Sequence, residues 1–190
     1  MREKFIPTNN DLSYYPLLFK ALEETTGEII EMGVGHGSTP LLHEYAVLNK
    51  RILESYETEK TWLSKFESLA NQYHTFTLVC RECWDSCSNM HPNPSVVFID
   101  HAPGERRKED LIKFKNCAEI IVLHDTEPTG AGDYRVRPLF NQFQFVVEVM
   151  SNAPNPREAG AWSTAVSNSI DITKWVGEQF GKYTVSKWQK

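Results

Sequence analysis

The chain has 190 residues, of which 41% are hydrophobic and 24% are charged. These proportions are those of an ordinary globular protein, so they exclude disorder or a coiled coil as the state of the whole chain. The length is enough for one sizeable core. The 20 basic and 25 acidic residues give a formal net charge of −5, which argues against a surface that holds a nucleic-acid backbone.

No apolar run approaches the roughly 18 residues that a membrane-spanning helix needs. The basic start over residues 1–4 has no apolar segment behind it, so we expect no signal peptide. A chain of this length does not need disulfides, and without a signal peptide we expect its four cysteines to be reduced. We therefore expect a cytoplasmic protein that has no membrane partner.

Short apolar runs alternate with amphipathic stretches along the chain, which is typical of strands joined by helices. Helices are predicted over residues 11–24, 38–49, 60–71, 105–116 and 171–180, and strands over 28–32, 51–57, 75–80, 96–100, 119–124, 143–150 and 162–168. The runs 96–100 and 119–124 are almost wholly apolar, as in parallel strands that are buried on both faces. The gap 151–161 is too short for a helical crossover, so the strands on either side of it are predicted to be antiparallel.

These elements predict an α/β fold, because connections in such chains are short and their crossovers are right-handed. We expect a doubly wound, Rossmann-like sheet that is mostly parallel, with an antiparallel C-terminal strand pair and with helices on both faces. A single domain would span residues 1–190. It would consist of an N-terminal helical segment (1–26), the sheet (27–168), and a C-terminal helix and tail (169–190).

Three glycines, Gly33, Gly35 and Gly37, follow the first predicted strand. Glycines between a strand and a helix permit a tight turn and let a ligand approach the backbone closely. Glu57 stands 57 − 37 = 20 residues beyond the third glycine, at the end of the second strand. A carboxylate at that position can accept hydrogen bonds from the hydroxyls of a ribose. The alternative for the glycines is a tight turn that binds no ligand. The alternative for Glu57 is a solvated charge at the end of a strand.

Glu31, two residues before the first glycine, narrows the class of ligand. The spacing G-x-G-x-G differs from the G-x-G-x-x-G of dinucleotide-binding oxidoreductases. A carboxylate so close to the helix start would repel a pyrophosphate. A ligand that carries an ammonium and a sulfonium group would tolerate the carboxylate or use it, directly or through water.

The stretch 31–62 resembles the class I S-adenosylmethionine-dependent methyltransferases, and the antiparallel end of the sheet also matches that family. The resemblance implies that S-adenosylmethionine is the cofactor. It implies that the glycine loop lies beneath the methionine and ribose parts of this cofactor, and that Glu57 holds the ribose. It places the adenine against residues just after the third strand, where Glu82, Trp84 and Asp85 are candidates. Trp84 either stacks on the base or packs into the core.

Polar residues follow two of the buried strands: Asp100 and His101 after one, His124 and Asp125 at the end of the next. Ligands of open α/β sheets bind at these strand ends. The segments resemble the metal-dependent small-molecule O-methyltransferases and related sugar-modifying methyltransferases. The resemblance implies that Asp100 and Asp125 bind a divalent cation such as Mg²⁺, which would lower the pKa of a substrate hydroxyl.

With the pKa of the hydroxyl lowered in this way, we expect His101 or His124 to act as the general base. This chain departs from the family pattern at Thr126, where an amide or a carboxylate is often found. The alternatives are that Asp100 positions the cofactor or substrate, that Asp125 caps a turn, and that both histidines are structural.

Two further groups of residues, an arginine pair and a cysteine cluster, each allow a functional and a structural interpretation. Arg106 and Arg107 begin a helix next to Asp100, and they either face an anionic substrate or form a solvated helix face. Cysteines 80, 83 and 87, with His91, are metal-type ligands. Their spacing matches no standard zinc pattern, so packing as small apolar side chains is the simpler interpretation.

Together these features predict an enzyme that methylates a small polar acceptor, at oxygen, with S-adenosylmethionine as donor. The alternatives are an NAD(P)-linked oxidoreductase and a non-catalytic binding protein with the same fold. No nucleic-acid partner is expected, and the sequence leaves a homo-oligomer open.

Overall fold

The computed structural model describes residues 12–80, 84, 92–128, 134–151, 161–181 and 183–188. Within these residues the chain forms one nine-stranded sheet, whose strand order is β3-β2-β1-β4-β5-β7-β6-β9-β8. The strands are β1 (Ile29–Met32), β2 (Leu53–Glu57), β3 (His74–Leu78), β4 (Val96–Ile99), β5 (Ile120–His124), β6 (Phe145–Ser151), β7 (Ser163–Ser167), β8 (Gln179–Phe180) and β9 (Tyr183–Lys187).

The described helices are short, and several are 3₁₀ turns. The α-helices are α1 (Tyr15–Glu24), α2 (Ser38–Asn49), α3 (Lys60–Leu63) and α5 (Arg107–Phe114). The 3₁₀ turns are η1 (Glu67–Leu69), η3 (Gly104–Arg106), η4 (Arg137–Gln142) and η5 (Ile172–Trp175). The single helix predicted over residues 60–71 is wrong, since α3 ends at Leu63. The helix predicted over 105–116 begins as η3 and continues as α5. No described helix has both the length and the apolar character that a bilayer crossing requires.

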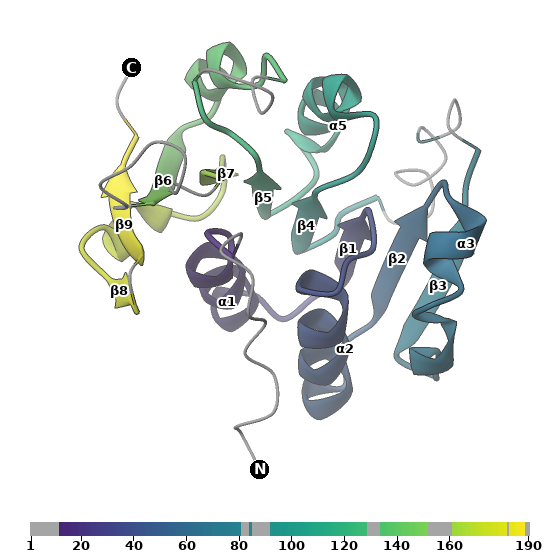
Figure 1. Cartoon of the computed structure of the whole chain (residues 1–190). Coiled ribbons are helices and arrows are strands. Elements are labelled where there is room, and N and C mark those ends of the chain that lie inside the picture. Colours follow the sequence, from purple (N-terminus) through teal and green to yellow (C-terminus); the bar gives the residue numbers. More distant parts are fainter. Residues whose placement is uncertain are drawn as a thin grey trace.

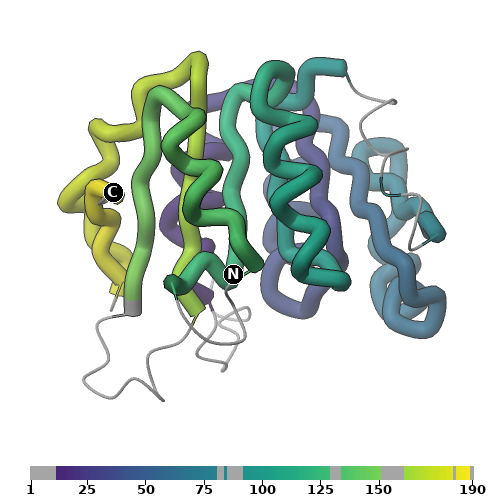
Figure 2. Tube along the Cα trace, turned by 90° about the horizontal axis from the view of Figure 1, so that it is seen from above, coloured from purple at the N-terminus to yellow at the C-terminus, as the bar shows by residue number. Residues whose placement is uncertain are grey.

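The helices cover both faces of the sheet, as the sequence predicted (Figures 1 and 2). Side chains alternate along each strand, so Ile29 and Leu53 join the core under α1 and α2, whereas Ile30 and Val97 join the core under α5 and η4. In Figure 1 the helices α1 and α2 lie on one side of the strands and α5 on the other. The doubly wound arrangement is thereby confirmed.

Strands β1 to β5 run parallel, and β1 pairs with both β2 and β4. The chain therefore leaves β1 on one side towards β2 and β3, and returns on the other side as β4. Such a reversal of strand order opens a crevice at the carboxyl ends of the central strands. The Asp100 amide donates to the Met32 carbonyl at 2.9 Å, so the chain segments after β1 and β4 lie against each other at this edge.

The antiparallel end of the sheet is confirmed and is larger than predicted. Strand β7 pairs antiparallel with both β5 and β6. Strand β9 then adds to β6, and β8 adds to β9. The predicted helix over 171–180 is wrong: this segment forms η5 and then β8, and the predicted tail holds β9.

The error has two visible causes. Ile172 and Trp175 have the spacing of a helix face, but a single 3₁₀ turn is enough to bury both of them. Gly177 (φ 92°) and Gly181 (φ 57°) then take left-handed backbone conformations, which end the helix and begin the turn between β8 and β9. The alternation of buried Tyr183 and Val185 with half-buried neighbours is the strand signal that helical spacing obscured.

Strand β9 can be tested by a pair of adjacent substitutions. Val185 is 1% exposed in the core beneath α1, whereas its neighbour Thr184 points to the other face and is half-buried. We expect Val185→Asp to lower the free energy of unfolding by roughly 3 kcal/mol or more, because it buries a charge without a partner. Thr184→Asp should change it by less than about 1 kcal/mol. Urea denaturation of both variants measures this, and equal small effects would show that residues 183–187 are not a packed strand.

Candidate functional site

The three glycines between β1 and α2 have different structural roles. Gly33 has φ 94°, and a Cβ at this residue would lie 2.7 Å from the carbonyl oxygen of Asp100. A Cβ at Gly37 would collide with the hydroxyl of Tyr14. A Cβ at Gly35 would meet only Ser38 Oγ, at 3.5 Å. The fold itself therefore needs glycine at 33 and 37, whereas Gly35 faces open space and is the position where a ligand can approach the loop.

Tyr14 fastens the start of α1 to this region. Its ring packs against Phe98 of β4 (centroids 4.8 Å apart) and meets the ring of His124 edge to face (4.9 Å). The next residue, Tyr15, donates a hydrogen bond from its hydroxyl to the Gly37 carbonyl at 3.0 Å. The N-terminal helix thus contacts both the glycine loop and the end of β5.

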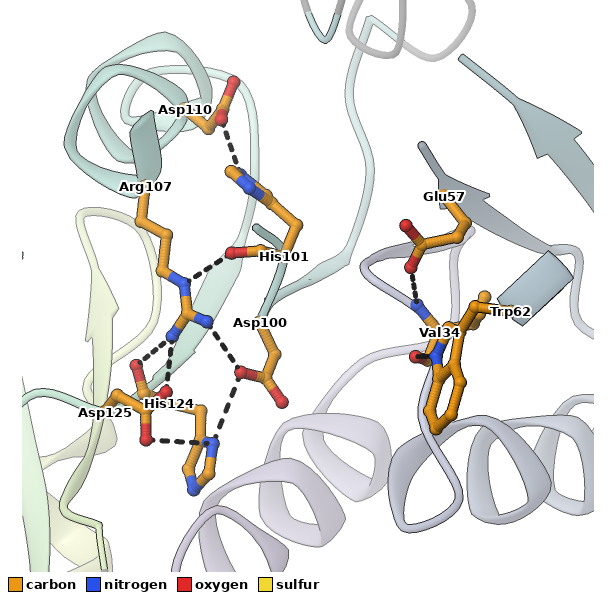
Figure 3. A network of polar contacts seen from close by, with 9 residues as sticks. All are labelled: Val34, Glu57, Trp62, Asp100, His101, Arg107, Asp110, His124 and Asp125. Carbon is orange, nitrogen blue, oxygen red and sulfur yellow. Dashed lines mark hydrogen bonds and ion pairs between the residues drawn. The ribbon is translucent and has the colours of Figure 1, made fainter. Parts of the chain in front are cut away.

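Glu57 stands at the end of β2 beside the glycine loop, as the sequence predicted. Its Oε2 accepts a hydrogen bond from the Val34 amide at 3.3 Å, and its Oε1 accepts from the amides of Thr58 (2.6 Å) and Glu59 (3.0 Å). Trp62 donates from Nε1 to the Val34 carbonyl at 2.7 Å. Figure 3 shows the Val34 peptide held between Glu57 and Trp62. The carboxylate is therefore fixed in direct contact with the loop.

Glu31 lies beneath the loop and is completely buried. Its carboxylate accepts hydrogen bonds from the hydroxyls of Ser38 (2.6 Å), Thr39 (2.9 Å) and Ser55 (2.5 Å). The Thr39 hydroxyl in turn accepts from the Gly35 amide at 2.8 Å. In this arrangement Glu31 supports the loop through hydroxyl groups, and its own oxygens are buried.

A chain of polar groups continues from Glu31 across β2 and β3. Ser55 Oγ lies 2.8 Å from Nε2 of His74, whose Nδ1 is 3.1 Å from Nδ1 of the half-buried His43 on α2. Burial lowers the pKa of His74 to about 3, so its ring is neutral. No sequence motif pointed to Ser55, His74 or His43 as part of this site. The pairing register of β1 and β2 could have revealed them. Ser55 lies opposite Glu31, which puts a second polar side chain on a buried face of the sheet.

Asp100 and Asp125 come together where β4 and β5 end, and a buried arginine joins them. Arg107 donates from Nη2 to Asp100 Oδ1 and from Nη1 to Asp125 Oδ2, each at 3.0 Å. His124 Nδ1 lies 3.3 Å from Asp100 Oδ1 and 3.5 Å from Asp125 Oδ1. Figure 3 shows this cluster of four residues, which we call the strand-end cluster.

The charges of the strand-end cluster affect His124. Burial by itself lowers the pKa of His124, but the charges of Asp100 and Asp125 outweigh it, so the pKa is raised. His124 is 7% exposed, and its buried Nε2 has no hydrogen-bond partner among the residues that the structure describes. The carboxylates are the accessible members, with side-chain exposures of 27% for Asp100 and 25% for Asp125. A ligand at this edge of the sheet would therefore meet the carboxylates before the imidazole.

The structure gives His101 and Trp84 structural positions, contrary to the catalytic and cofactor-binding roles expected of them. His101 is 1% exposed, and its Nε2 pairs with Asp110 Oδ2 of α5 at 2.8 Å. Trp84 is fully buried and stacks on the His101 ring with centroids 4.3 Å apart. Their burial favours the packing alternatives for these two residues. The other adenine candidates, Glu82 and Asp85, lie outside the described residues.

Two more expectations need correction. Arg107 is 6% exposed, so the interpretation of this residue as part of a solvated helix face is wrong. Cys80 is disulfide-bonded, so it is not the reduced, packed thiol that was expected. Cys83, Cys87 and His91 lie outside the described residues.

Comparison with solved structures identifies the fold. An O-methyltransferase from Bacillus cereus in complex with SAH has 14% sequence identity, a TM-score of 0.60, and coverage of 88% of this chain and 84% of its own. The METTL16 methyltransferase domain has 12% identity and a TM-score of 0.63, with coverage of 87% and 71%. An rRNA methylase from Streptococcus thermophilus has 11% identity and a TM-score of 0.58, with coverage of 81% and 95%.

No protein-family model and no curated protein sequence matches the chain. The likeness to solved structures extends over most of the chain and includes proteins whose substrates differ. The protein therefore has the fold of the class I S-adenosylmethionine-dependent methyltransferases, as the resemblance implied.

The buried carboxyl of Glu31 makes stability depend on pH. Burial raises its pKa to about 7, although hydrogen bonds from Ser38, Ser55 and Thr39 oppose the shift. The folded state therefore keeps a proton that the unfolded state releases near pH 4.5. The stability that this proton gives is complete below that pH and is lost as the pH rises through 7.

We therefore expect wild-type stability to fall relative to Glu31→Gln between about pH 5 and pH 8, by up to roughly 1.4 kcal/mol per pH unit. The lowered pKa of His74 gives a slope of opposite sign, which is common to both proteins and so cancels in their difference. Thermal denaturation across this pH range measures the effect. Parallel curves for the two proteins would contradict a protonated Glu31.

Proposed function

We propose that the protein transfers a methyl group from S-adenosylmethionine to an oxygen of a small polar acceptor. The observation that carries this proposal is the position of Glu57, whose carboxylate is fixed beside the open side of the glycine loop. The strand-end cluster lies at the same edge of the sheet, because Gly33 contacts the backbone of Asp100. A ligand on the loop would therefore lie next to a set of charged side chains.

The residues around the loop fit this cofactor. The loop backbone at Gly35 is open to close approach, and the Glu57 carboxylate is positioned to accept hydrogen bonds from ribose hydroxyls. Glu31 supports the loop from below through Thr39. When bound, S-adenosylmethionine supplies an electrophilic methyl group on a positively charged sulfur. A nicotinamide cofactor is a weaker candidate, because the sheet ends in antiparallel strands and the loop lacks the dinucleotide spacing.

The strand-end cluster would act on the acceptor. Asp100 is the most accessible member, and it would accept the proton of an acceptor hydroxyl as the new carbon–oxygen bond forms. Arg107 and His124 touch this carboxylate from within the protein, so they would hold it in one orientation. Most of the rate enhancement of such a transfer comes from placing the acceptor oxygen in line with the methyl carbon.

The divalent cation expected from the resemblance fits the strand-end cluster less well than S-adenosylmethionine fits the glycine loop. One ligand atom each from Asp100, His124 and Asp125 lies within 4.8 Å of the others, which is close enough for shared coordination. However, Arg107 already donates to an oxygen of each carboxylate. The proposed reaction therefore includes no step on a metal.

The acceptor class rests on charge and on the comparisons. The net charge of −5 favours a small molecule over a nucleic acid, and one structural neighbour is an O-methyltransferase. Another neighbour is an rRNA methylase, so RNA belongs among the acceptors to be tested. If the protein methylates RNA but no small polyhydroxylated or phenolic compound, the acceptor is RNA and the small-molecule part of the proposal is wrong.

Calorimetry with S-adenosylhomocysteine tests the cofactor. Gly35→Val places a side chain in open space, so the protein should fold normally while binding is abolished. Glu57→Gln should weaken binding about tenfold or more, because a ribose hydroxyl loses its charged acceptor. Glu54→Gln on the same strand points to the other face and serves as the matched control.

The proposal fails if wild-type protein does not bind at millimolar S-adenosylhomocysteine, or if Gly35→Val binds as tightly as wild type. Tighter binding of a nicotinamide cofactor would favour the oxidoreductase. Binding without turnover on any acceptor tested would favour a non-catalytic protein.

A further inference from the structure

We propose that Arg107 is the resident cation of the strand-end cluster, and that this site therefore takes no divalent metal ion. The inference rests on the proposed function for its setting, since it concerns the same two carboxylates. It assigns to a side chain the charge that a metal ion supplies in metal-dependent methyltransferases.

Arg107 forms ion pairs with both carboxylates of the cluster and hydrogen bonds with two backbone carbonyl groups. Its Nη2 donates to Asp100 and its Nη1 donates to Asp125, both at 3.0 Å. Its Nε donates to the His101 carbonyl at 2.9 Å, and Nη1 also donates to the His124 carbonyl at 3.0 Å. These four bonds use four of the five N–H donors of the planar guanidinium, which fixes its orientation.

The surroundings keep this guanidinium in place. Arg107 is the first residue of α5, directly after the turn η3, and its side chain is 7% exposed. The ring of Tyr134 lies over it, with the guanidinium carbon 4.7 Å from the ring centroid. Gly104 makes room for that ring, because a Cβ there would collide with Tyr134. The guanidinium thus contacts the Tyr134 ring, two carboxylates and two backbone carbonyl groups.

A divalent ion would have to compete with this arrangement. To use one oxygen from each carboxylate it would approach a fixed positive charge, which repels it strongly in a partly buried site. To displace Arg107 it would leave a guanidinium buried without its carboxylate partners, which is unfavourable. His124 Nδ1 also faces both carboxylates, so a second side chain occupies the same space.

The first test measures metal binding by the wild-type protein. Mn²⁺ serves as the probe, because its free ion gives an electron paramagnetic resonance signal that disappears on binding. We expect the free-ion signal to be unchanged by wild-type protein at millimolar Mn²⁺. Saturable binding that Asp100→Asn removes would overturn the inference.

The second test creates a metal site by removing the arginine. Arg107→Ala leaves Asp100, His124 and Asp125 without their cation, and those residues are a suitable set for Mn²⁺. We expect this variant to bind Mn²⁺ at least tenfold more tightly than wild type, and Asp100→Asn in the same variant to remove the gain. Arg107→Lys keeps a positive charge beside the carboxylates, so it should not gain affinity.

Lys108→Ala is the matched control, because it removes one positive charge from the next residue of α5 without touching the cluster. It should bind no more Mn²⁺ than wild type. A gain in Lys108→Ala equal to that in Arg107→Ala would overturn the assignment, because it would show a general effect of charge. If Arg107→Ala does not fold by circular dichroism, Arg107→Met keeps the volume of the stem and replaces it.

These outcomes separate the inference from the proposed function. A protein that fails to bind S-adenosylhomocysteine contradicts the proposed function, whatever its response to Mn²⁺. A protein that binds both S-adenosylhomocysteine and Mn²⁺ at Asp100 keeps the proposed function and contradicts the role of Arg107.

Discussion

The close contact between Gly33 and the backbone of Asp100 is the constraint on which this site depends. It follows from the pairing of β1 with β4, which continues past the strands through the hydrogen bond from the Asp100 amide to the Met32 carbonyl. Because Gly33 has no side chain, the loop after β1 and the first residue after β4 meet directly. The part of the molecule suited to a cofactor and the part suited to chemistry are therefore neighbours in the backbone itself.

Both parts contain a buried ionisable group that is held by partners within the protein. Glu31 is held by three hydroxyl groups, and Arg107 is held by two carboxylates and two carbonyls. A buried polar or charged group is unfavourable unless such partners surround it. The carboxylates of Asp100 and Asp125 at the strand ends keep about a quarter of their side-chain surface exposed, whereas Glu57 beside the loop is 9% exposed.

The sequence predicted the central sheet well, because β1, β4 and β5 are mostly apolar runs that are buried along their whole length. It also placed Glu57, Asp100, His124 and Asp125 at strand ends, where the structure has them. It failed at the C-terminus, where burial of Ile172 and Trp175 imitated a helix and two glycines turned the chain. It could not separate His101 from His124, because their difference arises from contacts with Asp110 and Trp84 that are distant along the chain.

The approach of Tyr14 to Gly37 links two positions that are far apart in the sequence. Any side chain at 37 would collide with the Tyr14 hydroxyl, while the Tyr14 ring packs on Phe98 and His124. Homologous chains can therefore replace this glycine only if the residue at 14 becomes smaller. Paired variation at these two positions would reveal, from sequences alone, which relatives keep the N-terminal helix seated against the end of β5. The same pair offers a point at which directed evolution can loosen that helix without altering a charged residue.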